Sequence, residues 1–383
     1  PHYEGPVVYV PDASRSVGVA QSLLSDQAAA YINELNADYV KVREQHANKK
    51  QTPMWPLARA RANKTPIDWS AYQPTRPKFI GRRVFKNFDL TELARYIDWG
   101  PFFQTWDLAG PFPAILKDEV VGTEAVRVFA DGKRMLQRMI EGRWLTANGV
   151  VGFWPANTER DDDIVLYTDD SRRQAALTWY GMRQQTEKQA IDGVMRPSRC
   201  LADFVAPRNP DGSGVADYVG MFAVTAGIGA DKKERQFIDD LDDYSAIMFK
   251  ALADRLAEAF AEALHHRVRT DLWGYAAGES LDNEAMIKEQ YRGIRPAPGY
   301  PACPDHSVKG PMFDLLQCDE IGMTLTESLA MLPAASVSGF YLGHPDATYF
   351  NVGKIGPDQL ADQAARRGVD EKALARLLAP NLS

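Results

Sequence analysis

Apolar residues recur along this chain with the period of an α-helix in some segments and of a β-strand in others. The longest helical pattern spans residues 243–270, where an apolar side chain returns every four residues and forms one stripe. Further helical patterns cover residues 89–98, 119–141 and 358–378, and strand-like runs cover residues 149–155, 163–168, 217–225, 335–342 and 347–355. Helices and strands mix without regular βαβ order, so residues 79–383 are predicted to form an α+β domain with a largely antiparallel sheet.

The first 78 residues follow a different pattern. Residues 6–25 indicate one strand followed by one helix, and a lone strand of a parallel sheet cannot cover both of its faces. Residues 1–25 are therefore predicted to be the C-terminal remnant of an α/β domain. Residues 26–78 are polar and helix-prone at first and then rich in proline, which predicts a linker. A chain that begins near residue 75 is then expected to keep the stability of the main domain.

Composition narrows the class of protein. The 383 residues carry 51 acidic and 44 basic side chains, a net charge of −7, which argues against a nucleic-acid partner. No run of 18 apolar residues and no secretory signal occurs, so we expect no membrane span. Three scattered cysteines favour a reducing, cytoplasmic location, and without CxxC or HxxxH pairs no metal site is expected.

Residues 295–306 form the most unusual segment of the chain. Four prolines within nine residues predict a rigid, non-helical loop, which is a suitable platform for a polar ligand. Arg295 at its head could bind a carboxylate through both arms of its guanidinium, or it could face solvent on a stiff connection. Cys303 is interpreted as structural because no activating group accompanies it, and no catalytic residue is predicted.

Three other segments allow more than one interpretation. Asp98 lies among aromatic residues at a helix end, where it could pair with a ligand cation or cap a local amide. Residues 348–352 are predicted to be a strand whose aromatic side chains could cover a purine ring, or could be ordinary strand aromatics. Residues 226–231 resemble a glycine-rich nucleotide loop but lack its third glycine, so a turn is predicted.

Several of these segments together resemble the activation domain of cobalamin-dependent methionine synthases. The similar segments are residues 96–103, 184–188, 200–207, 250–262, 295–306 and 335–339. Residues 8–15 are similar to the last strand and loop of the cobalamin-binding domain of those enzymes. The Asp-x-His-x-x-Gly motif that ligates cobalt in the family is absent, as are the homocysteine and folate modules. The resemblance therefore implies a fragment that cannot make methionine alone.

The resemblance also implies a fold and a ligand. The fold would be a C-shaped α+β domain with a twisted, largely antiparallel sheet, and S-adenosylmethionine would lie in a shallow groove. Arg295 would hold the methionine carboxylate, and Asp98 would meet the ammonium or a nearby donor of the ligand. The remaining contacts implied for the ligand come from Ala297, Gly299, Tyr300, Tyr349 and Phe350, with Glu258 and Glu289 close by. Ala13 would touch the edge of the cobalamin.

The implied function is the reductive reactivation of cob(II)alamin in methionine biosynthesis. S-adenosylmethionine would supply the methyl group, a cobalamin held by a neighbouring domain would receive it, and a flavodoxin-like protein would supply the electron. The protein itself would orient the methyl group. An alternative from another class is a free-standing S-adenosylmethionine-dependent methyltransferase of small molecules, which would need an enclosed pocket. A third is a docking module for the cobalamin domain and the electron donor.

Overall fold

The computed structural model describes residues 7–10, 19–47, 53–209 and 211–383, in two compact units, Pro1–Pro53 and Met54–Ser383. In the first unit, residues 19–23 are helical and α2 spans Ala28–Ala47. Residues 7–10 form no strand, so the strand predicted at residues 6–10 is wrong in its described part. Instead, the backbone amide of Tyr9 donates to the Tyr39 hydroxyl on α2, at 2.9 Å.

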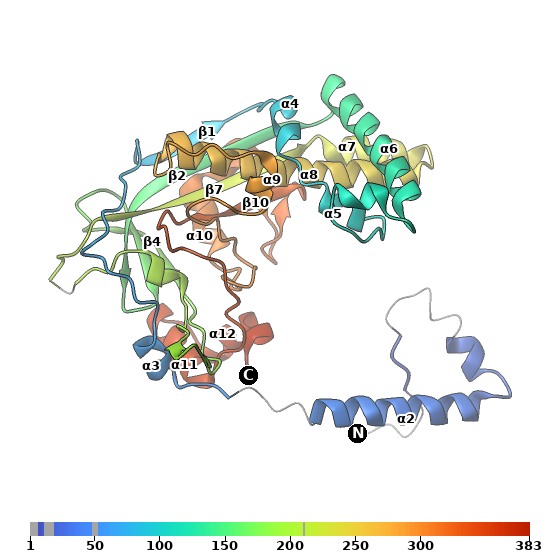
Figure 1. Ribbon diagram of the computed structural model, residues 1–383, viewed down its shortest axis with the longest axis horizontal. Helices are drawn as coiled ribbons and strands as arrows, with labels where there is room; N and C mark the ends of the chain where they lie inside the picture. The colour runs from blue at the N-terminus through green and yellow to red at the C-terminus, as the bar shows by residue number, and fades with distance from the viewer. Residues whose placement is uncertain (1–6, 11–18, 48–52, 210) are drawn as a thin grey trace. The chain divides into compact units, whose positions relative to one another are not determined.

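A six-stranded antiparallel sheet organises the second unit (Figure 1). Its strands are β1 (Gly81–Phe85), β2 (Thr146–Glu159), β3 (Asp163–Tyr167), β4 (Ala175–Tyr180), β7 (Asp217–Ile228) and β10 (Ser336–Tyr341). The order is β10-β7-β2-β3-β4, and every pair is antiparallel. The long strand β2 pairs with β1 and β3 along one edge and with β7 along the other, and β10 lies at an end of the sheet. The predicted α+β class and antiparallel sheet are confirmed.

Both faces of the central strands are buried. Along β7, Phe222 and Val224 belong to one hydrophobic core, while Met221 and Ala223 belong to the other. This alternation follows from the two-residue period of a strand, which sends successive side chains to opposite faces. The first core contains the apolar stripe of α8 (Asp243–Arg267), and the second contains the apolar side chains of α10 (Lys309–Leu316).

The predicted helices form with shifted ends. The helix α6 spans Gly122–Glu141, the pattern at residues 89–98 gives α4 (Leu90–Leu93) and a 3-10 turn, and α8 continues as a π-helix over Val268–Leu272. The pattern at residues 358–378 gives α11 (Pro357–Arg367) and α12 (Glu371–Leu377), separated at Gly368 with φ of 66°. The remaining elements are α3 (Leu57–Ala62), α5 (Gly100–Gln104), α7 (Ala230–Asp239), α9 (Asn283–Ile287), β5 (Ala190–Ile191), β6 (Val194–Met195), β8 (Thr324–Leu325) and β9 (Met331–Leu332).

Two local predictions at the ends of strands have clear outcomes. The strand predicted at residues 347–355 is wrong, because this segment pairs with no strand of the sheet and runs as an extended loop. The turn predicted within residues 226–231 is confirmed at Gly229, with φ of 93°, because β7 (Asp217–Ile228) ends just before it and α7 begins just after it. Among the described residues, no helix combines the length and the apolar character needed to cross a membrane.

Residues 54–78, expected to belong to a linker, pack within the second unit. The side chains of Trp55 and Leu57 are buried, and the Leu57 amide donates to Asp358 at 2.6 Å. Arg61 pairs with Asp162 at 2.7 Å, and the fully buried Asp162 also pairs with Arg183 at 2.7 Å. The boundary between the units therefore lies at residues 53 and 54, earlier than the expected linker end at residue 78.

We predict that a chain beginning at Met54 melts at the same temperature as the full chain, whereas one beginning at Thr75 melts at least about 5 °C lower. The shorter chain loses the buried Trp55 and Leu57, each worth about 1.5–3 kcal/mol, and the charge that faces Asp162. Calorimetry of the three chains measures both effects. Equal melting temperatures for all three would show that residues 54–74 contribute nothing to the fold.

Candidate functional site

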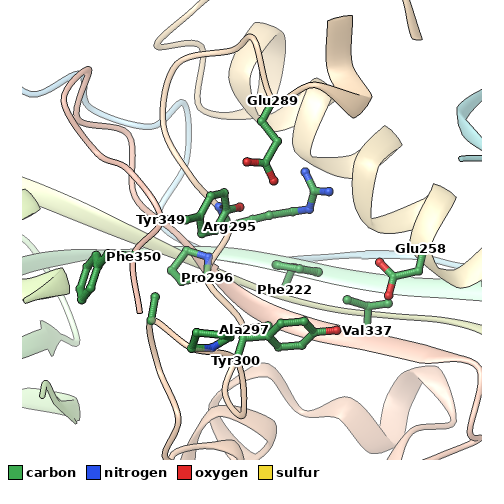
Figure 2. Close-up of a pocket in the computed structure, with 12 residues that line it drawn as sticks. Phe222, Glu258, Glu289, Arg295, Pro296, Ala297, Tyr300, Val337, Tyr349 and Phe350 are labelled. Carbon is green, nitrogen blue, oxygen red and sulfur yellow. The ribbon is translucent and has the colours of Figure 1, made fainter. Parts of the chain in front are cut away.

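A cavity of about 460 Å³ lies at the β10 edge of the sheet, between this edge, α8 and the proline-rich loop (Figure 2). Its lining residues are Phe222, Glu258, Glu289, Arg295, Pro296, Ala297, Tyr300, Pro301, Ala302, Val337, Tyr349 and Phe350. They come from five separate stretches of the sequence, and most of their side chains are apolar. A largely apolar cavity with a few convergent charged groups is the usual form of a small-molecule site.

The loop reaches this position because it runs along the outer edge of β10. Ile294 and Leu342 exchange two backbone hydrogen bonds at 3.0 Å, and the Phe340 amide donates to the Pro296 carbonyl at 2.9 Å. Gly339 permits this approach, since a Cβ there would lie 2.8 Å from the Pro296 oxygen. The loop therefore extends the sheet by a short, irregular segment that carries Arg295 at its centre.

Gly299 shapes the loop without lining the cavity. Its φ is 98°, a conformation that favours glycine, and an added Cβ would lie 2.1 Å from the His306 ring. Its amide donates to the Cys303 carbonyl at 2.7 Å, which closes the turn. Cys303 is buried, and burial raises the pKa of its thiol to about 12, so the side chain stays protonated at neutral pH. This agrees with its interpretation as a structural cysteine.

Arg295 is held from several sides. Its backbone amide donates to the Tyr349 hydroxyl at 2.9 Å, and its Nη1 donates to the Tyr291 hydroxyl at 2.8 Å. Its Nη2 forms an ion pair with Glu262 at 2.7 Å. Burial by itself would lower the pKa of Arg295, but the negative charge of Glu262 outweighs it and the pKa is raised. The guanidinium is thus a fixed positive charge and not a solvent-facing group on a stiff connection.

Behind Arg295, the charges continue as a buried chain. Arg269, fully buried, lies 3.7 Å from Glu262 and pairs with Glu279 at 2.7 Å. Two arginines and two glutamates therefore alternate and balance, which is how buried charges are accommodated. Glu262 Oε1 and Arg269 Nη1 have no hydrogen-bond partner among the described residues. Glu262 is 6% exposed, so it is a buried charge and not part of a solvated face of α8.

A buried histidine completes the surroundings of Arg295. His265 stacks on Tyr341 with ring centres 5.0 Å apart, and its Nδ1 lies 3.3 Å from Arg295 Nη1. Burial, reinforced by the positive charges of Arg269 and Arg295, holds the pKa of His265 well below its ordinary value. His265 is therefore neutral at neutral pH, and the guanidinium remains the positive group that faces the cavity from this side.

Two carboxylates, those of Glu258 and Glu289, also line the cavity. Figure 2 shows Glu289 beside the Arg295 guanidinium, while Glu258 on α8 faces the hydroxyl end of Tyr300. Partial burial raises the pKa of Glu289, an effect that the charge of Arg295 opposes. Tyr300 is 59% exposed, so this side of the cavity is accessible from solvent. The site thus offers one positive and two negative charges within an apolar wall.

Seven of the residues predicted for the ligand line this one cavity, namely Glu258, Glu289, Arg295, Ala297, Tyr300, Tyr349 and Phe350. Gly299 and Asp98 are not among its lining residues. Asp98 instead accepts a hydrogen bond from the Gly100 amide at 2.9 Å, which is the local capping alternative. Ala13 lies outside the described residues. Their roles toward a ligand, like those of the seven, stay predictions.

Sequence patterns missed several residues that matter to the geometry, above all Glu262, His265 and Tyr291. One available signal was the ring of alanines around Glu262 at positions 257, 259, 261 and 263. Small residues on every side of a helix indicate burial all round, and a glutamate among them needs a partner. Within the part of the chain that the structure describes, no three His, Cys, Asp or Glu side chains gather as a metal site.

Comparisons with known proteins agree with this geometry. Residues 89–368 match the family model described as "Vitamin B12 dependent methionine synthase, activation domain". The crystal structure of the MetH reactivation domain bound to AdoHcy is 49% identical in sequence, with a TM-score of 0.81, and the match covers 87% of this chain and 99% of that one. The matched residues include the whole sheet apart from β1, together with the cavity. The chain therefore belongs to the family of activation domains of vitamin B12-dependent methionine synthases.

Proposed function

We propose that this chain binds S-adenosylmethionine in the cavity at the β10 edge and presents its methyl group to a cobalamin held by a separate domain. The observation that carries the proposal is the match of charges. The ligand has one carboxylate and two cationic centres, the ammonium and the sulfonium, and the cavity has one guanidinium and two carboxylates. The similar reactivation domain was crystallised with AdoHcy, which is this ligand without its methyl group.

Arg295 is the group that would hold the ligand carboxylate. Its Nη1 donates to Tyr291 and its Nη2 pairs with Glu262, so a ligand carboxylate would bind on the Nε side and share Nη2 with Glu262. Because Glu262 and Tyr291 already fix the guanidinium, little side-chain entropy remains to be lost on binding. Glu258 and Glu289 would face the cationic centres, and Asp98 would join them only after leaving the Gly100 amide.

The adenosine is assigned to the aromatic end of the cavity. Figure 2 shows Tyr349 beside Arg295 and Phe350 further along the same wall. Tyr349 is anchored by the hydrogen bond from the Arg295 amide, so its ring position is coupled to that of the carboxylate-binding group. Phe350 offers a ring face and no hydroxyl, so it would contact the adenosine through its ring or backbone alone. Ala297, Tyr300 and the turn at Gly299 would supply the remaining contacts.

The protein's part in the chemistry would be orientation. When bound to its own domain, the cobalamin supplies the nucleophile that accepts the methyl group, and a flavodoxin-like donor would provide the electron. Transfer of a methyl group from a sulfonium moves no proton, so the cavity needs no general base, only a fixed ligand with its methyl exposed. The exposed Tyr300 side supports such access. Residues 1–25 would be the tail of the cobalamin domain, and the buried, unpaired cysteines suit a cytoplasmic setting.

We predict that Arg295→Ala weakens S-adenosylmethionine binding by roughly 2–5 kcal/mol, because the ligand carboxylate loses a charge-assisted fork. Arg295→Lys should also bind poorly, since an ammonium cannot reproduce the fork. Calorimetric titration of the full chain measures both affinities. Arg376→Ala, at an exposed arginine on α12, is the matched control and should bind normally. Unchanged affinity in a folded Arg295→Ala variant would refute the assignment of the site.

We predict that the chain binds S-adenosylmethionine but transfers no methyl group to homocysteine. A thiol acceptor must be activated as a thiolate, usually by a metal, and the described residues hold no metal-site cluster. Adding the cobalamin-binding domain with its cofactor and a low-potential electron source should yield methylated cobalamin. The absorbance spectrum of the cobalamin measures its formation. Methylation of homocysteine without cobalamin would instead support the free-standing methyltransferase.

We predict that His265 makes the fold sensitive to acid. Its pKa is depressed in the folded state, so the unfolded chain takes up a proton below about pH 6.5 that the folded chain does not, and stability falls as pH decreases. In His265→Gln this loss is absent, and the difference in unfolding free energy between the two proteins should change by up to about 1.4 kcal/mol per pH unit. Urea unfolding at pH 7.5, 6.5 and 5.5 tests this, and a constant difference would contradict it.

A further inference from the structure

A second cavity, of about 310 Å³, lies on the β3–β4 side of the sheet and shares no residue with the first. Its walls come from the end of β2, from β3 and β4, from the turn that joins these two strands, and from α11. Five arginines line it, namely Arg160, Arg172, Arg173, Arg208 and Arg366. The family assignment and the proposed methyl-donor site give this cavity no role.

Among the residues that line this cavity, arginines outnumber carboxylates. Only Glu159 and Asp163 line the same cavity, so five positive charges face two negative ones in a chain whose net charge is −7. Glu159 also accepts a hydrogen bond from the Tyr167 hydroxyl at 2.6 Å, and Asp163 pairs with Arg366 Nη1. The excess of positive charge is therefore local and is not a consequence of overall composition.

Two of the arginines keep buried donors without a partner. Arg366 Nη2 and Arg208 Nε are both buried, and neither has a hydrogen-bond partner among the described residues. The Arg366 side chain is only 7% exposed. Leaving such donors unpaired is costly, and buried polar groups in folded proteins are nearly always satisfied. Both donors belong to side chains that line the cavity.

The electrostatic environment of Arg366 points the same way. Burial, together with the positive charge of Arg61, lowers the pKa of Arg366 to about 10, although its Nε and Nη1 face Asp362 and Asp163. A lowered pKa at an arginine means that the local negative charge does not compensate for desolvation and neighbouring cations. A further anion in the cavity would restore that balance.

Hydrogen bonds fix the positions of Arg172 and Arg208. Arg172 Nη1 donates to Asn157 at 2.9 Å and its Nη2 to the Asp217 carbonyl at 3.0 Å. Arg208 Nη1 donates to the Arg172 carbonyl at 2.6 Å. These bonds hold both side chains against the sheet, so little of their side-chain entropy remains to be lost when a ligand binds. Arg160 and Arg173 are exposed and can close over an anion from the rim.

We infer that this arginine cavity binds an oxyanion of the phosphate class, either inorganic phosphate or a phosphate monoester. Five arginines against two carboxylates leave three positive charges, which suit a dianion better than a single carboxylate. A phosphate group also offers three acceptor oxygens to guanidinium donors that approach from several directions. The residues of this cavity leave room for a group of that size beside Thr178 and Tyr180.

Calorimetric titration of the full chain with sodium phosphate, at constant ionic strength set with chloride, tests the inference. We expect saturable binding that is weakened at least about tenfold in Arg208→Gln and in the double variant Arg160→Gln, Arg173→Gln, because each variant loses charge-assisted contacts to the anion. The double variant changes exposed side chains only and should fold normally. Repeating the titration with glycerol phosphate distinguishes a site for phosphate esters, which bind more tightly, from one for the free ion.

Arg235→Gln, at an exposed arginine on α7, is the matched control and should bind phosphate like the unchanged chain. All variants should retain their affinity for S-adenosylmethionine, which separates this inference from the proposed function. Absence of saturable binding to phosphate and to glycerol phosphate in the unchanged chain would overturn it. Equal weakening in Arg235→Gln would also overturn it, since the effect would then reflect net charge alone.

Discussion

The ion pair between Glu262 and Arg295 is the contact on which the arrangement of the site depends. Glu262 lies on α8, whose apolar stripe forms much of the core against the sheet. Arg295 lies on the loop that runs along the outer edge of β10. Burying one of these charges alone would cost several kcal/mol. The pair therefore ties the loop to the core helix, and the position of the guanidinium follows from the packing of α8 and not from the loop alone.

The edge strand β10 provides the second constraint. An edge strand exposes unpaired backbone groups, and here the segment around Ile294 and Pro296 satisfies them. Because Gly339 lets that segment lie directly against the strand, the cavity has one wall of sheet and one wall of rigid loop. These two walls suit the proposed role of holding a ligand in a fixed direction for another domain.

Sequence patterns predicted the features that depend on local chemistry. The period of α8 and the antiparallel sheet follow from spacing and residue type. The resemblance to activation domains, and not local pattern alone, implied the seven residues that line one cavity. The features that sequence patterns did not predict correctly depend on contacts with residues that are remote in the sequence. Residues 347–355 have the composition of a strand but no neighbouring strand to pair with, and nothing in the helix that carries Glu262 shows that Arg295 lies opposite.

The buried charges also couple stability to binding. The chain from Arg295 through Glu262 and Arg269 to Glu279 is neutral as a whole, so it can persist inside the protein, yet one oxygen of Glu262 and one nitrogen of Arg269 lack hydrogen bonds among the described residues. A ligand carboxylate on the Nε and Nη2 edge of Arg295 would compete with Glu262 for the same positive charge. Because Glu262 also lies beside Arg269, it stays within a paired set of charges when a ligand carboxylate shares the Arg295 guanidinium.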